Sequence, residues 1–308
     1  MPHSILVTGA AGGQQGSTGR LIAMHLLKQG IPVRAFVHKL DARSEGLREE
    51  GAEVFVGDLL DPASVQAAMK GIKRAYFSYP VQDGLLEAAA IFVTSTSEAG
   101  VDFVVNNSQF QDTPEDSTFR DLRGAPSFRN LQHRLADRIF DWAQIPTAHI
   151  QAPPYFENVR TLVSRSVLEQ DAAFLPWGDG DAVFPLAGAE DVARVAATLL
   201  ASSDVPAAKA YTLVSEVLTA RQIFDTLGKA IGRPIRYVPI TDEQWADAVK
   251  ERINAHALDH LSHLWKYFRN GHVRRRVTST VYEVTGSAPQ ALEEFFQANA
   301  TSFVAAKN

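Results

Sequence analysis

Cysteine is absent from this sequence of 308 residues. Its absence excludes disulfide bonds, zinc–thiolate sites, cysteine-ligated iron–sulfur clusters and cysteine nucleophiles. The sequence also lacks any apolar run near the roughly 18 residues of a membrane span, and its first apolar run, Ile5 to Val7, is too short for a secretory signal. We therefore expect a soluble, cytoplasmic protein without a membrane partner.

An excess of positive charge is also lacking. The chain has 30 Lys+Arg against 35 Asp+Glu, which gives a formal net charge of -5. Such a charge repels nucleic acid, so we expect no nucleic-acid partner, and any phosphate must be held by a local cationic group. The hydrophobic share of 45% and the charged share of 21% are those of ordinary globular proteins. The length predicts one large domain or two modest ones.

The first half of the sequence alternates short β-branched runs with longer helical patterns. The expected strands are residues 4–8, 32–37, 53–56, 74–79, 102–106 and 147–151. The helices expected between them are residues 19–29, 43–50, 62–70, 85–99 and 128–144. This alternation predicts an α/β fold with a Rossmann-like, doubly wound parallel sheet.

The alternation loosens after Pro153 and Pro154, because a proline pair cannot continue a central strand. We place a boundary there, with a Rossmann domain at 1–152 and a smaller C-terminal α/β substrate region at 153–308. A strand expected at 210–214 can return to the main sheet, so the two parts are partly intertwined. A later stretch is expected to be rich in loops, because it contains Pro176, Gly178, Gly180, Pro185 and Gly188. The later elements are expected at 190–200, 220–232, 235–239, 242–252, 255–268 and 290–301.

A glycine-rich segment directly follows the first strand and directly precedes a helix. In that position, glycines let backbone N–H groups approach a pyrophosphate at the helix N-terminus, so the segment predicts a dinucleotide-binding turn. The third glycine of the motif is either Gly16 or Gly19; the alternative is a plain surface loop. The residues expected to hold the dinucleotide here are Gly9, Gly12, Gln14, Gln15, Gly16 and Gly19.

The end of the second strand indicates which dinucleotide is bound. A site that prefers NAD places a carboxylate there for the ribose hydroxyls. Here His38 and Lys39 occupy the strand end and Arg43 follows in the next helix, so a 2′-phosphate would meet cations and NADP(H) is favoured. Asp41 is the objection, because a shifted loop could bring its carboxylate onto the ribose. A solvated turn is the alternative for His38 and Lys39.

The ends of the next strands carry further polar groups, and ligands bind at the carboxyl ends of parallel strands. Asp58, beside Leu59, is expected to accept a hydrogen bond from the adenine amine. Asp61 and Pro62 are expected to form the N-cap and first position of a helix. The residues expected near the nicotinamide are Ser78, Tyr79, Pro80, Asn107 and Ser108.

Taken together, these residues resemble the NmrA-like family of atypical short-chain dehydrogenases/reductases. The segments that carry the resemblance are residues 7–12, 54–62, 145–147, 153–158, 190–193, 211–213 and 232–239. The resemblance covers nearly the whole chain. It implies an NADP-preferring Rossmann fold with a smaller substrate region, in a family that contains both reductases and regulators that bind NADP without turning it over.

The tyrosine–lysine pair of many short-chain enzymes is missing, because no tyrosine is followed four residues later by lysine. The resemblance implies a lysine on the helix before the sixth strand, with an acidic residue four positions later. Here His133 and Asp137 occupy those positions. Such a pair can orient an imidazole and raise its pKa, which makes His133 a candidate proton donor or ribose anchor. An ordinary helix-surface pair is the alternative. Tyr155 is the second candidate proton donor.

Other clusters have simpler interpretations. Three histidines share a helix face, but no further metal ligand accompanies them, so we expect a solvated or packed face and no metal. Three aromatic residues of the second half, Phe156, Trp177 and Phe184, either line an apolar pocket or pack in a core. The three histidines are His256, His260 and His263.

Two functions fit these features. The first is an NADPH-dependent oxidoreductase that transfers hydride to a small organic acceptor. Without the tyrosine–lysine pair, a quinone, imine, enone or activated carbonyl is the expected acceptor, because an electron-poor acceptor needs less help from an acid. The alternative is a non-catalytic NADP(H)-sensing regulatory protein that acts through partner binding. The oligomeric state is unknown from the sequence.

Overall fold

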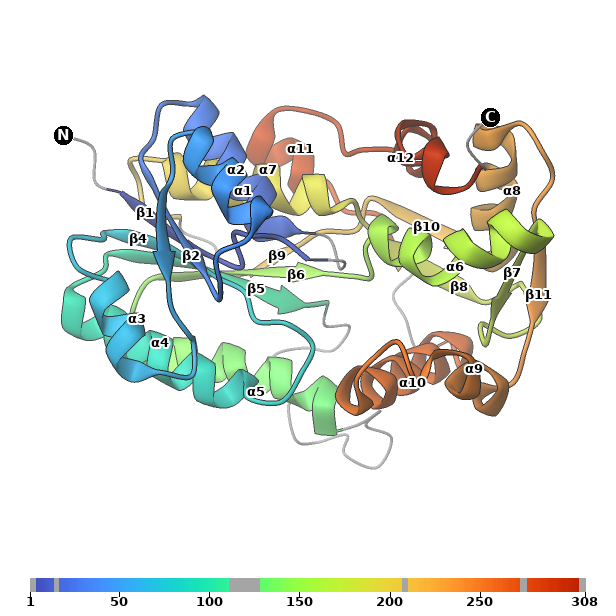
Figure 1. Ribbon diagram of the computed structural model, residues 1–308, viewed down its shortest axis with the longest axis horizontal. Coiled ribbons are helices and arrows are strands. Elements are labelled where there is room, and N and C mark those ends of the chain that lie inside the picture. Colours follow the sequence, from blue (N-terminus) through green and yellow to red (C-terminus); the bar gives the residue numbers. More distant parts are fainter. Residues whose placement is uncertain (1–3, 14–16, 111–127, 207–209, 272–275, 305–308) are drawn as a thin grey trace.

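A seven-stranded parallel sheet organises the first part of the molecule (Figure 1). The computed structural model describes residues 4–13, 17–110, 128–206, 210–271 and 276–304. The strands of the sheet are β1 (Ile5–Thr8), β2 (Val33–Val37), β3 (Glu53–Val56), β4 (Arg74–Phe77), β5 (Phe103–Gln109), β6 (Thr147–Ala152) and β9 (Ala210–Thr212). Their order is β3-β2-β1-β4-β5-β6-β9, and every neighbouring pair is parallel. The predicted Rossmann-like α/β fold is confirmed.

Helices cover both faces of this sheet (Figure 1). One layer contains α1 (Thr18–Lys28), α2 (Ala42–Glu49), α7 (Ala189–Ala201) and α11 (Thr280–Thr285). The other contains α3 (Pro62–Ala68), α4 (Leu85–Ala99) and α5 (Phe128–Trp142). Successive strand side chains alternate between the layers, so Ile5 and Val7 pack in the first core and Leu6 in the second. Asp61 N-caps α3 with Pro62 at its first position, as the sequence predicts.

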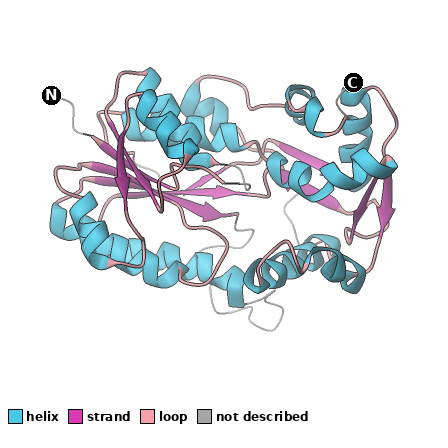
Figure 2. Ribbon diagram, in the orientation of Figure 1, coloured by secondary structure: helices cyan, strands magenta, loops and turns pink. Residues whose placement is uncertain are grey.

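The second part of the molecule is built on two small sheets with helices packed around them (Figure 2). Strand β10 (Glu216–Thr219) pairs with β8 (Val183–Leu186) antiparallel, and β11 (Arg236–Pro239) pairs with β7 (Ala172–Leu175) parallel. The helices are α6 (Phe156–Gln170), α8 (Ala220–Ile231), α9 (Asp242–Val249), α10 (Ala255–Arg269) and α12 (Leu292–Ala298). Three buried aromatic side chains belong to the core between these elements and are packing residues: Phe156, Trp177 and Phe184.

The structure contains a helix just after the two prolines that the sequence analysis does not predict. Residues 156–170 form α6. Val159, Val163 and Val167 are spaced four apart and all lie buried on one face of this helix. This four-residue spacing is present in the sequence and indicates a helix, but the preceding proline pair indicates a turn.

Later segments return to the first sheet. Strand β9 pairs with β6, while α7 and α11 pack on the same face of the sheet as α1. The second half of the chain therefore completes the core of the first. In Figure 1 the arrowheads of β5 and β6 point toward the second part, so the carboxyl ends of these strands face it. Within the described ranges, none of the helices has the length and apolar character of a membrane span.

Candidate active site

The glycine-rich turn between β1 and α1 forms one wall of the site. Gly9 and Gly12 have φ angles of 64° and 78°, a region that other residues disfavour. Gly12 N donates to Gly9 O at 3.0 Å. The Ser17 hydroxyl donates to Gly13 O at 2.6 Å and accepts from Gly13 N at 3.1 Å. The turn thus ends at the N-terminus of α1, where unpaired backbone N–H groups attract anions.

Gly19 lies where α1 passes very close to β1. A Cβ atom added at Gly19 would lie 2.3 Å from the carbonyl oxygen of Thr8. Gly19, one of the two glycines proposed as the third of the motif, therefore provides a close helix–strand contact. Three of the predicted cofactor-binding residues lie outside the described part of the chain: Gln14, Gln15 and Gly16.

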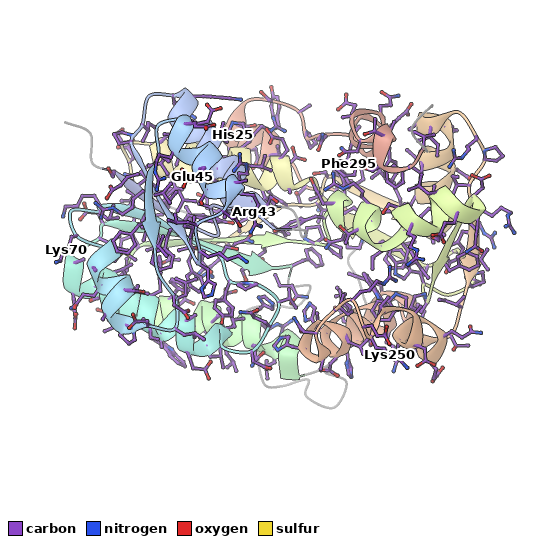
Figure 3. The ribbon with its side chains drawn as sticks, in the orientation of Figure 1. His25, Arg43, Glu45, Lys70, Lys250 and Phe295 are labelled. Carbon is purple, nitrogen blue, oxygen red and sulfur yellow. The ribbon has the colours of Figure 1, made fainter. Side chains whose placement is uncertain are left out.

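The end of β2 faces this turn through Arg43. Arg43 Nη1 donates to Gly12 O at 2.9 Å, and Figure 3 shows Arg43 on the side of the molecule that carries α1 and α2. His38 and Lys39 are exposed at the strand end. The Asp41 carboxylate N-caps α2 and forms an ion pair with Arg43. Arg43 therefore contacts the glycine-rich turn with one part of its guanidinium and the Asp41 carboxylate with another.

The chain after β3 passes close to β2. A Cβ atom at Gly57 would lie 2.6 Å from the ring of Phe36, so a side chain there would force the two apart. Asp58 is exposed, and its Oδ1 accepts from Leu60 N at 2.9 Å. Leu59 packs partly against the core on the α3–α4 side. Asp58 and Leu59 thus lie next to each other at the carboxyl edge of the sheet.

The end of β4 is held to the end of β1 at the point where the strand order reverses. Thr8 Oγ1 accepts from Ser78 N at 2.8 Å and donates to Ser78 O at 3.1 Å. Tyr79 follows, and its hydroxyl donates to Asp83 O at 3.0 Å, while Pro80 is exposed. Ligands bind at such switch points in open α/β sheets. The sequence prediction omits Thr8, although a polar residue just before the first glycine is a visible signal.

Asn107 at the end of β5 contacts Tyr155, which follows β6. The Tyr155 hydroxyl lies 3.3 Å from both Oδ1 and Nδ2 of Asn107. Tyr155 is also the N-cap residue of α6, and its backbone N donates to Asn158 Oδ1 at 2.7 Å. Burial raises the pKa of Tyr155 to about 12, against the opposing effect of the hydrogen bond with Asn107. The phenol therefore keeps its proton at neutral pH.

Ser108 faces α5 and not Tyr155, because neighbouring residues of a strand point to opposite faces. Its hydroxyl donates to Asp137 Oδ2 at 2.7 Å, and Asn106 Nδ2 donates to Asp137 Oδ1 at 2.8 Å. All three side chains are buried. Ser108 therefore anchors the end of β5 to α5.

His149 of β6 joins the same buried group. Its Nδ1 lies 3.4 Å from Asp137 Oδ1 and its Nε2 lies 3.4 Å from Asp141 Oδ1. Burial opposes a charged ring, but the hydrogen bonds with Asp137 and Asp141 outweigh burial and raise the pKa of His149 to about 9. We call Asn106, Ser108, Asp137, Asp141 and His149 the α5 polar cluster.

His133 has a different environment from the one its spacing suggests. Its ring lies against His260 of α10, with ring centroids 5.8 Å apart. The expected rise in pKa is wrong, because burial outweighs Asp137 and, with His256, lowers the pKa of His133 to about 4. At neutral pH the imidazole is therefore neutral, and it can donate an N–H hydrogen bond but not act as an imidazolium acid.

Helix α10 contacts the loop that follows β4. His256 Nδ1 lies 2.9 Å from Asp83 Oδ1, and Asn254 Nδ2 donates to Val81 O at 3.4 Å. His263 Nδ1 lies 2.9 Å from Asp259 O. In the described residues, no three His, Asp or Glu side chains are grouped to hold a metal ion. His256 and His260 thus join the two parts of the molecule at the edge of the site, whereas His263 bonds within α10.

Comparison with known proteins identifies the family. The sequence model of the NmrA-like family matches residues 1–296. The chain belongs to the NmrA-like family. An NAD(P)H azoreductase from Xenophilus azovorans is 25% identical over 304 residues, which are 98% of this chain and 100% of that protein.

Two solved structures share this NmrA-like fold. The triphenylmethane reductase of Citrobacter sp., complexed with NADP(H), has a TM-score of 0.78 at 22% identity and covers 96% of this chain and 100% of its own. The NADPH-dependent quinone oxidoreductase of Escherichia coli, complexed with NADPH, has a TM-score of 0.80 at 20% identity with the same coverage. The fold extends over nearly the whole of all three chains.

Some contacts that shape this NmrA-like site are absent from the sequence prediction. Thr18 could be expected to reach a phosphate, but its hydroxyl lies 2.9 Å from the Tyr76 hydroxyl, a buried link between α1 and β4, and burial raises the pKa of Tyr76. The contact of Asn106 Nδ2 with His149 Nδ1, at 3.0 Å, is another. Both side chains are buried, and a buried polar group needs a hydrogen-bond partner. That requirement is the signal that could have found them.

Proposed function

We propose that this protein is an NADPH-dependent oxidoreductase that reduces a small organic acceptor by hydride transfer. The observation that carries the proposal is the glycine-rich turn facing Arg43, which pairs a pyrophosphate-binding wall with a cation at the end of β2. The similar proteins are an azoreductase, a triphenylmethane reductase and a quinone oxidoreductase, and this favours a reductase over a non-catalytic NADP(H) sensor.

In this proposal the dinucleotide lies along the carboxyl edge of the sheet. The turn and Gly19 hold the pyrophosphate at the N-terminus of α1, and Arg43, with His38 and Lys39, holds the 2′-phosphate. Asp58 and Leu59 bind the adenine. The nicotinamide lies beside residues that the structure places at the ends of β4 and β5: Ser78, Tyr79, Pro80 and Asn107. Ser108 acts by holding β5, because its hydroxyl is bound to Asp137.

The bound NADPH supplies the hydride, so the chain supplies orientation and a proton. Tyr155 is our first candidate for the proton donor, because its phenol is protonated at neutral pH and touches Asn107. His133 is neutral and is proposed to bind the acceptor through its ring N–H. A donor as weak as this phenol suits electron-poor acceptors, such as quinones, azo compounds, imines and enones.

The test is NADPH oxidation by the purified protein, followed by its near-ultraviolet absorbance, with a panel of quinones, azo dyes, triphenylmethane dyes, imines and enones. We expect turnover with at least one class. Tyr155→Phe should then lower kcat about tenfold with unchanged NADPH affinity, and His133→Ala should act mainly on KM. Tight NADP binding without turnover of any acceptor would establish the sensor alternative instead.

We also propose a cytoplasmic protein with no nucleic-acid partner. The net charge of -5 and the absence of cysteine from the sequence favour both statements.

A further inference from the structure

The Asp41 carboxylate is fully engaged at the start of α2. Its Oδ1 accepts from the backbone N–H groups of Arg43 at 2.9 Å and of Ser44 at 3.4 Å. The Ser44 hydroxyl in turn accepts from Asp41 N at 2.9 Å, which completes a capping box. The same carboxylate accepts from the guanidinium, with Nε 3.1 Å and Nη2 2.5 Å from Oδ2. One side chain therefore caps the helix and fixes the Arg43 side chain.

The other side of the guanidinium is fixed to the glycine-rich turn. Arg43 Nη1 donates to Gly12 O at 2.9 Å, and Arg20 Nη1 of α1 donates to Arg43 O at 2.7 Å. The guanidinium thus spans the gap between the turn and the end of β2. A guanidinium has five N–H donors. The bonds formed within the described residues leave one N–H on each terminal nitrogen, on a side chain that is 50% exposed.

We propose that Asp41 is a positioning residue for cofactor selection, whose carboxylate holds Arg43 between the glycine-rich turn and the end of β2 and thereby favours NADP(H). This inference rests on the proposed function. It is opposite to the usual role of a carboxylate near this strand end, which selects NAD(H) by binding the ribose hydroxyls. Asp41 cannot play that usual role in this arrangement, because its oxygens are bound to Arg43 and to the first turn of α2.

Two physical effects decide whether Asp41 strengthens or weakens NADP(H) binding. An arginine side chain has many rotamers, so ordering it when the cofactor binds costs conformational entropy. Asp41 already holds Arg43 in one conformation, and this lowers the entropy cost of binding. The Asp41 charge opposes a phosphate, but Arg43 balances it and the exposed Lys39 adds positive charge nearby. The hydrogen bond with Arg43 lowers the pKa of Asp41 to about 2, so the ion pair persists at neutral pH. Positioning therefore outweighs repulsion.

Asp41→Ser separates positioning from helix capping. Serine is as good an N-cap as aspartate, but it cannot bind the guanidinium through a carboxylate. Ser44→Ala is the matched control, because it breaks the capping box and leaves the Asp41–Arg43 pair intact. Arg43→Ala removes the cation itself. Dissociation constants for NADP⁺ and NAD⁺ are measured for each full-length variant by calorimetric titration, together with Tm.

We expect Asp41→Ser to weaken NADP⁺ binding about fivefold and Arg43→Ala about tenfold, with NAD⁺ binding changed less than about twofold in each. Asp41→Ser should have no further effect in the Arg43→Ala background, because both act through one interaction. Ser44→Ala should lower Tm and leave the ratio of the two affinities unchanged.

Tighter NADP⁺ binding by Asp41→Ser would overturn the inference, since the carboxylate would then act mainly by repelling the phosphate. Equal losses for both nucleotides would also overturn it and show a purely structural role. Either result, with tight NADP⁺ binding and turnover in the wild-type protein, leaves the proposed function standing. Wild-type protein that binds neither nucleotide would overturn both.

Discussion

Two polar groups at the same sheet edge differ in how the chain builds them. The Asp41–Arg43 pair joins residues two positions apart at the start of one helix. The α5 polar cluster joins two strands and a helix, with Asn106 and Asp137 separated by 31 positions and Asn106 and His149 by 43. The first group is visible in the local sequence, and the second exists only once the sheet has formed.

The two groups also differ in their exposure to water. The Arg43 side chain is 50% exposed, whereas the His149 side chain is 6% exposed. Water can replace the contacts of an exposed ion pair, so such pairs contribute little to folding stability. A buried polar group left without its partner has no such replacement. We therefore expect the exposed pair to affect cofactor choice and the buried cluster to affect stability.

The largest effect is expected from Asp137→Ala. Its removal takes the shared carboxylate partner away from the buried side chains of Asn106, Ser108 and His149, and the free energy of unfolding should fall by about 4 kcal/mol. Urea unfolding measures the loss. The matched control is Asp61→Ala, which removes an exposed helix N-cap and should cost about 1 kcal/mol. Equal losses in the two variants would contradict the distinction between buried and exposed groups.

The second effect is a pH dependence of stability that originates in His149. Its folded pKa of about 9 lies above the ordinary value of 6.5, so the folded protein binds this proton more tightly than the unfolded chain. The stabilisation is complete below pH 6.5 and disappears as the pH rises through about 9. The free energy of unfolding should therefore fall by about 3 kcal/mol over this interval.

His149→Gln should remove this pH dependence in urea unfolding measured at each pH. His133 does not interfere, because its lowered pKa gives a stabilisation that is present above pH 6.5 and is lost as the pH falls toward about 4. If the free energy of unfolding of the variant falls with pH as steeply as that of the wild-type protein, groups outside the cluster cause the pH dependence.

The smallest effect is expected at the cofactor turn, from Gly19→Ala. The new Cβ would lie 2.3 Å from a backbone oxygen of β1, so α1 must shift, at a cost of about 2 kcal/mol in stability. NADP⁺ binding should weaken as well, because the helix N-terminus moves with it. Gly13→Ala is the control, since a Cβ there meets nothing within 4 Å. Unaltered stability and affinity in Gly19→Ala would show that the close contact is unimportant.

Much of the fold follows from patterns within short windows of sequence. The expected helix at 85–99 is α4 (Leu85–Ala99) to the residue, and Asp61–Pro62 begins α3 as expected. Helix α6 is the main element that the sequence analysis does not predict. Pro153 and Pro154 indicate a turn, although the four-residue spacing of the valines that follow indicates a helix. Periodicity and capping act locally, which is why they can be read without a structure.

Asp137 shows where this local reasoning ends. Its spacing from His133 on one helix predicts a pair with a raised histidine pKa. In the folded protein the Asp137 carboxylate contacts Ser108, Asn106 and His149. Burial against α10 lowers the pKa of His133 to about 4. Spacing along a helix shows which residues can meet, but the elements that pack against the helix decide which of them do.

The sequence alone determined the sheet, the dinucleotide turn and the cationic end of β2, because each depends on residues close together in the chain. The tertiary structure alone decided that Gly19 provides a close helix–strand contact, that Arg43 reaches the glycine-rich turn, and that Asp137 contacts His149. Hydrogen-bond partners and burial depend on distances between elements that are far apart in sequence. The pKa values follow from both, so they too belong to the folded molecule.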